Sequence, residues 1–145
     1  DPATTAELLD DALATLAGYG LGAPEVFVPP FNRFDAAQLP ALAQRFAVVG
    51  GGPEAIRTLG FHRTPQWRGD TVYLPSYFPF YGHAAEVREP ARRAIERGSG
   101  LWTPIVLHWG WEADAGWAEL ERLAALIAPH AVPWSELSAA VERSR

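Results

Sequence analysis

A histidine, two tryptophans and a glutamate lie within five residues of one another, directly after an apolar run: His108, Trp109, Trp111 and Glu112. An imidazole can take up or release a proton near neutral pH, which suits a general acid or base. A flat indole can pack against the apolar face of a sugar ring. We therefore predict acid–base chemistry on a carbohydrate substrate, with His108 as catalytic residue and Trp109 and Trp111 as substrate-binding residues. The alternative is that His108 is a hydrogen-bonded strand residue and the tryptophans are core.

The geometry of this cluster depends on where the preceding strand ends. If extended backbone continues past Trp109, His108 and Glu112 share one side of the strand and the two tryptophans share the other. A glycosidase acid at Glu112 would need a second carboxylate, and none of the other predicted strand ends carries one. We therefore expect Glu112 to be solvated or to lie at a helix N-terminus.

A second group of candidate residues lies in two irregular stretches, residues 61–69 and 75–82. The later stretch is an aromatic loop that we expect either to face the substrate, with Tyr77 binding it, or to cover the rim of the fold. Loop histidines are more often solvated or structural, which is our expectation for the histidines outside the first cluster. The residues concerned are Tyr77, Phe78, Phe80, Tyr81, His62 and His83. His130 instead opens a predicted strand at the face away from the site, and we expect it to be structural.

The composition excludes several classes of function. The net charge of −5 argues against binding to nucleic acid or to an anionic membrane surface, and no apolar stretch is long enough for a transmembrane helix. The chain has no cysteine, and all 12 basic residues are arginine. Thiolate metal sites, cysteine nucleophiles and lysine Schiff bases are therefore excluded.

The elements that position these residues alternate between strand and helix along one predicted domain, residues 1–145. Strands are expected at 25–28, 46–49, 71–74, 104–109 and 131–133 because these runs are short, apolar and bounded by glycine or proline. Helices are expected from Thr4 to Gly18, after a capping box at Asp35 and Gln38, at 53–59, from Pro90 in a first turn, at 117–127 and at 135–143. This alternation predicts an α/β fold with a parallel sheet, either open or closed into a barrel.

Three motifs in this order resemble the C-terminal portion of the polysaccharide deacetylase family, also called the NodB homology domain. They are Val26-Phe27-Val28-Pro29-Pro30-Phe31-Asn32, then Ile105-Val106-Leu107-His108, then Ala131-Val132-Pro133-Trp134-Ser135-Glu136-Leu137. The resemblance implies part of an incomplete TIM-like (β/α) barrel and a metal-dependent hydrolase that removes acetyl groups from a carbohydrate.

The resemblance also implies roles for individual residues. Phe31 would occupy the position whose backbone amide binds the oxyanion, Asn32 would have a polar role beside it, and His108 would protonate the leaving amine. The match is not complete, because the family's leucine stands two residues before its histidine, where this chain has Val106. The chain also has Val28 or Pro29 where the family has an arginine that orients a catalytic aspartate.

The metal ligands of the family are missing from this sequence. The family binds a divalent ion, usually zinc, through an aspartate and two closely spaced histidines of its N-terminal half, whereas the histidines here are at least 21 residues apart. The chain also contains no methionine and begins with Asp1. We therefore expect a piece of a longer protein that lacks the N-terminal half of the barrel, holds no metal and is inactive alone. The alternative is a non-catalytic α/β module that binds carbohydrate or protein through Trp109, Trp111 and the aromatic loop 77–81.

Overall fold

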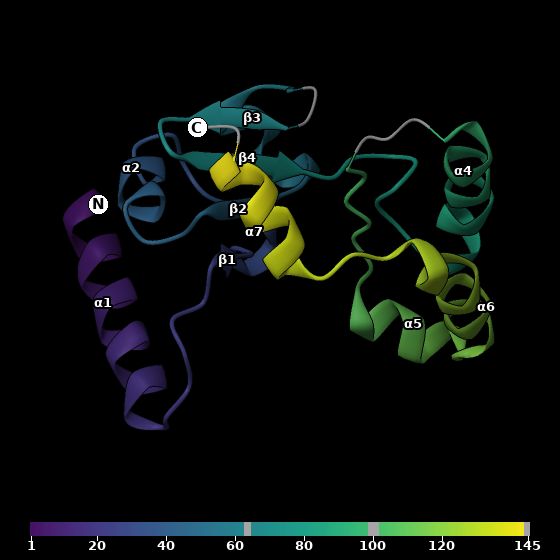
Figure 1. The fold of residues 1–145 in the computed structure, drawn as a ribbon, viewed down its shortest axis with the longest axis horizontal. Coiled ribbons are helices and arrows are strands. Elements are labelled where there is room, and N and C mark those ends of the chain that lie inside the picture. Colours follow the sequence, from purple (N-terminus) through teal and green to yellow (C-terminus); the bar gives the residue numbers. More distant parts are fainter. Residues whose placement is uncertain (63–64, 99–101, 144–145) are drawn as a thin grey trace. The chain divides into compact units, whose positions relative to one another are not determined.

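The computed structural model describes residues 1–62, 65–98 and 102–143 (Figure 1). The chain forms two compact units, Asp1–Pro75 with Trp134–Arg145, and Ser76–Pro133. No helix in the described part of the chain has both the length and the apolar character that crossing a bilayer requires.

The first unit contains a four-stranded sheet in the order β1-β2-β4-β3. The strands β1 (Val26–Phe27), β2 (Val48–Gly51) and β4 (Thr71–Pro75) are parallel, with Val26 opposite Val48 and Val48 opposite Val72. This confirms an α/β fold and the first three predicted strands. An additional strand, β3 (Gln66–Arg68), pairs antiparallel with β4 inside a stretch predicted to be irregular.

Helical segments connect and flank these strands: α1 (Pro2–Gly18), η1 (Pro30–Asn32), α2 (Leu39–Ala43), η2 (Pro53–Ala55), α3 (Ile56–Leu59) and α7 (Trp134–Arg143). The Asp1 side chain caps α1 by accepting the Ala3 amide at 3.1 Å. The predicted capping pair also meets, since the Gln38 side chain accepts the Asp35 amide at 2.8 Å. However, the α-helix begins only at Leu39, after this pair.

The core of the first unit is apolar and contains several aromatic rings. Phe27 stacks on Phe46 with ring centroids 4.9 Å apart, and Phe34 meets Tyr73 edge-on at 5.7 Å. Figure 1 shows α1 and α2 side by side, and α1 contributes one buried side chain to this core. The buried residues of the cluster are Leu9, Phe34, Leu39, Leu42, Phe46, Val49 and Tyr73.

The second unit is built from helices: α4 (Ala84–Arg97), α5 (Trp109–Ala115), α6 (Ala118–Ile127) and η3 (Ala128–His130). Helices α4 and α6 pack together around Ala84, Val87, Ala91 and Leu123. The expectation that Pro90 opens a helix is wrong, because α4 begins at Ala84 and contains Pro90 in its interior.

Two predicted strands are not strands of the sheet. Within residues 102–109, only Val106 forms a bridge, a parallel one with Tyr81, and the helix α5 begins at Trp109. The apolar run is instead partly buried by helices, since Ile105 and Leu107 pack against the core between α4 and α6. Residues 131–133 are not assigned to a strand either, and Pro133 has no amide proton to donate to one.

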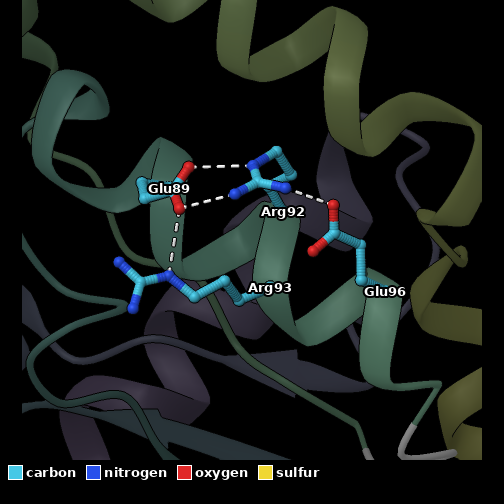
Figure 2. A network of polar contacts seen from close by, with 4 residues as sticks. All are labelled: Glu89, Arg92, Arg93 and Glu96. Carbon is cyan, nitrogen blue, oxygen red and sulfur yellow. Dashed lines mark hydrogen bonds and ion pairs between the residues drawn. The ribbon is translucent and has the colours of Figure 1, made fainter.

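The outer face of α4 is charged. Glu89 accepts hydrogen bonds from Arg92 at 2.7 and 2.8 Å and from Arg93 at 3.0 Å, while Arg92 also pairs with Glu96 (Figure 2). The hydrogen bonds and the charge of Arg92 lower the pKa of Glu89 to about 2. A further ion pair joins Arg88 of α4 to Glu119 of α6 at 3.1 Å.

Candidate functional site

The candidate site lies in the second unit, where two extended segments run parallel. Tyr81 and Val106 form the bridge between them, with the Val106 amide donating to the Phe80 carbonyl at 3.0 Å and the Gly82 amide donating to the Val106 carbonyl at 3.3 Å. Each segment ends two residues later at a histidine, and each histidine is the residue that precedes a helix. His83 precedes α4 and His108 precedes α5.

His108 has both a polar and an aromatic partner. Its Nε2 atom lies 2.8 Å from the Tyr81 hydroxyl, and its ring centroid lies 3.9 Å from that of Trp111. The first turn of α5 places Trp111 three residues after His108, on the same side of the chain. The side chain of His108 is therefore held between a hydroxyl and an indole.

Glu112 and His83 complete this cluster. Glu112 is almost fully buried, with 2% of its surface exposed, and its Oε1 atom accepts the Ala84 amide at 2.9 Å. The same oxygen lies 3.7 Å from Nδ1 of His83, whose ring centroid is 5.2 Å from that of Trp111. Of the two positions expected for Glu112, solvated or at a helix N-terminus, the structure shows the second. The helix whose N-terminus it meets is α4, although Glu112 belongs to α5.

Trp109 does not lie with Trp111, in contrast to the arrangement predicted for an extended chain. The backbone becomes helical at Trp109, so strand alternation ends there. Trp109 packs against Trp117 with ring centroids 4.5 Å apart and remains 75% exposed. The helical turn instead places Trp111 and Glu112 on the side of His108.

Tyr81, more than Tyr77, is the tyrosine of this site. The Tyr77 carbonyl accepts the Phe80 amide at 2.8 Å within a turn, and its hydroxyl oxygen is buried. The sequence predicts Tyr81 only as part of the aromatic loop and His83 as a solvated or structural histidine. In the structure His83 directly precedes α4, and Tyr81 stands two residues before it.

Phe31 and Asn32 belong to the first unit. Both have backbone angles in the left-handed region, with φ of 55° and 51°, which is uncommon for residues with a side chain. The Phe31 side chain is 87% exposed, whereas Asn32 is buried and its amide donates to the Pro29 carbonyl at 2.9 Å. This tight turn follows β1 directly, at the carboxyl end of a parallel strand.

Of the remaining histidines, His62 has structural surroundings, whereas His130 is exposed. His62 bonds the Leu59 carbonyl and meets the Tyr73 ring edge-on, and His130 ends η3. Within residues 1–62, 65–98 and 102–143, no group of three or more metal-ligating side chains is placed to hold an ion. The residues present therefore do not fit the metal site that the family resemblance implies.

The comparisons with known proteins add no relative. The chain matches no protein-family model, no curated protein and no solved structure.

Proposed function

We propose that this chain supplies the general acid and part of the sugar-binding surface of a carbohydrate deacetylase, within an incomplete (β/α) barrel. The observation that carries the proposal is the placement of His108, whose Nε2 atom lies 2.8 Å from the Tyr81 hydroxyl while its ring lies against Trp111. In this role His108 donates a proton to the leaving nitrogen or oxygen as the bond to the acetyl carbon breaks.

The Tyr81 hydroxyl suits a group that must change its protonation state. Because Nε2 bonds this hydroxyl, the proposal assigns the donated proton to Nδ1, and the Tyr81 oxygen accepts from Nε2–H both before and after that proton leaves. His108 therefore keeps the same partner before and after proton transfer. Trp111 is 44% exposed and offers part of its indole to a sugar ring next to this imidazole.

The family resemblance separately implies an oxyanion-binding role for Phe31, which belongs to the first unit. In the resembled family a backbone amide at this position binds the oxyanion, and here the residue lies in a constrained turn at a strand end. A divalent metal, expected to be zinc, would activate the attacking water in the complete fold. Because the described residues do not fit a metal site, the proposal assigns to the second unit only proton transfer and sugar binding.

The test is acetate release from acetylated oligosaccharides by the full-length protein. Replacing the acid, His108→Ala, is expected to lower kcat by about 10²- to 10⁴-fold. His130→Ala is the matched control, because His130 is an exposed histidine of the same unit, and it should leave kcat unchanged. Chelation should abolish the activity. Full activity of the His108 variant would remove the proposed mechanism.

The second candidate is a non-catalytic module that binds carbohydrate. It is favoured by one observation, the contact of Trp109 with Trp117, which leaves two indoles together at the surface with exposures of 75% and 39%. Calorimetric titration with neutral oligosaccharides distinguishes the two candidates. A module of this kind would bind them, would lose affinity on Trp109→Ala, and would release no acetate.

A further inference from the structure

The Glu112 carboxyl group is buried without being part of the proposed proton transfer. Burying a carboxyl group costs free energy unless its oxygens find hydrogen-bond partners. Here Oε1 accepts the Ala84 amide at 2.9 Å and faces Nδ1 of His83 at 3.7 Å. Both partners lie at the start of α4, so the carboxyl group is fixed to one end of that helix.

The backbone of Glu112 is fixed to the other helix. Its amide donates to the His108 carbonyl at 3.1 Å, which closes the first turn of α5. One residue thus connects the N-terminus of α4 to the N-terminus of α5. The two histidines that precede these helices, His83 and His108, are the two whose rings contact Trp111.

We infer that Glu112 is the positioning residue of this site, holding His83 and His108 against the indole of Trp111 by joining the first turns of α4 and α5. The catalytic meaning of the inference rests on the proposed function, whereas the structural part does not. It adds His83 to the site as a second imidazole, beside the proton donor. The family resemblance assigns no role to Glu112 or to His83.

The test compares three variants of the full chain. Glu112→Gln keeps the shape and an oxygen that can accept the Ala84 amide, whereas Glu112→Leu keeps only a similar volume. Asp114→Asn is the matched control, because Asp114 is an exposed acidic residue of α5. Two spectroscopic quantities are measured by NMR: the ring-current shifts that Trp111 imposes on the carbon-bound protons of His83 and His108, and the exchange rate of the Ala84 amide.

We expect Glu112→Leu to collapse the ring-current shifts of both imidazoles and to speed exchange of the Ala84 amide by about tenfold or more, since a buried hydrogen bond is lost. Glu112→Gln should restore most of both quantities, and Asp114→Asn should change neither. A folded Glu112→Leu variant with unchanged shifts and exchange would overturn the inference. If that variant does not fold, Glu112→Gln decides, because loss of the shifts in a folded Gln variant with a protected Ala84 amide would overturn it too.

The kinetic arm separates this inference from the proposed function. In the full-length protein, Glu112→Leu should lower kcat more than it raises KM for an acetylated oligosaccharide, with rescue by Glu112→Gln. If His108→Ala leaves acetate release intact, the proposed function fails. The positioning role is still supported in that case if the ring-current shifts respond to Glu112 as expected.

Discussion

His83 and His108 occupy equivalent positions in the second unit. Each ends an extended segment, each precedes a helix, and their ring centroids lie 5.2 and 3.9 Å from that of the same indole, Trp111. The segments are parallel, as the bridge between Tyr81 and Val106 shows. Parallel segments bring residues at their carboxyl ends to one edge, which is where α/β folds gather functional groups. His83 and His108 follow this rule, although the segments that carry them are joined by one β-bridge and not by a full strand pairing.

Tyr81→Phe should weaken the placement of His108 without disturbing the core. The substitution removes the hydroxyl 2.8 Å from Nε2 and keeps the ring. Because a net hydrogen bond contributes about 0.5–1.5 kcal/mol, we expect kcat for acetate release to fall by about two- to tenfold. Tyr19→Phe, at an 80% exposed tyrosine, is the control and should have no effect. Equal kcat for the two variants would show that Tyr81 does not support His108.

The parallel strands of the first unit could be predicted because local sequence and tertiary environment agree there. Val48, Val49 and Val72 are β-branched, and the structure buries all three. The strand β3 could not be predicted, since Gln66-Trp67-Arg68 has no strand pattern and forms through its pairing with β4. Conversely, the apolar run 104–109 resembles a buried strand, but an apolar segment covered by helices has the same pattern.

The candidate site was predicted in its residue types but not in its geometry. Strand alternation would place His108 and Trp111 on opposite sides of the chain. In the structure their rings meet, with centroids 3.9 Å apart. The error arises at one point, because the chain becomes helical at Trp109 and residues three and four apart then share a face. The partners Tyr81, His83 and Ala84 come from a segment more than 20 residues away, and a single sequence without relatives contains no signal for that pairing.

Gly51→Ala should destabilise the first unit. A Cβ atom at this position would lie 2.6 Å from the Tyr73 hydroxyl and 2.7 Å from the same ring. Tyr73 is 1% exposed and is held edge-on by Phe34, so the ring has little room to move. We expect the free energy of unfolding to fall by about 1–3 kcal/mol, measured by urea denaturation followed by circular dichroism.

The control for Gly51→Ala is Gly110→Ala, which we expect to raise the free energy of unfolding and not to lower it. Gly110 lies inside α5, and a Cβ atom there would meet nothing within 4 Å. Alanine should stabilise this helix by about 0.5–1 kcal/mol because glycine loses more backbone entropy. Equal stability of the Gly51 variant and the unmodified chain would show that the Tyr73 ring adjusts freely.

Thr71→Val should also destabilise the first unit, through a lost hydrogen bond. The buried Thr71 hydroxyl lies 2.9 Å from the carbonyl oxygens of both Ala43 and Phe46. Ala43 is the last residue of α2, and Phe46 follows three residues later. Valine has the same shape but no hydroxyl, so the cost is that of unsatisfied buried groups, about 1–3 kcal/mol. Thr71→Ser retains the hydroxyl and should recover part of this loss. A valine variant as stable as the serine variant would contradict the assignment.

The Glu89 network of α4 should make stability depend on pH in a defined range. Its hydrogen bonds and ion pairs with Arg92 and Arg93 lower the pKa of Glu89 from 4.5 to about 2 (Figure 2). A group whose pKa is lower in the folded state stabilises the fold above its unfolded pKa and loses that contribution as pH falls. The contribution should therefore be complete above about pH 4.5 and should disappear between there and about pH 2.

Glu89→Gln tests this expectation. The variant should unfold at a lower temperature than the unmodified chain at pH 7, and the two curves should converge as pH falls from 4.5 toward 2. The difference should be small and should shrink at high salt, because the network is exposed and screened by ions. Glu121→Gln, at an exposed glutamate of α6, is the control and should keep a constant offset over this range. A Glu89 difference that persists unchanged at pH 2 would show that the ion pairs do not stabilise α4.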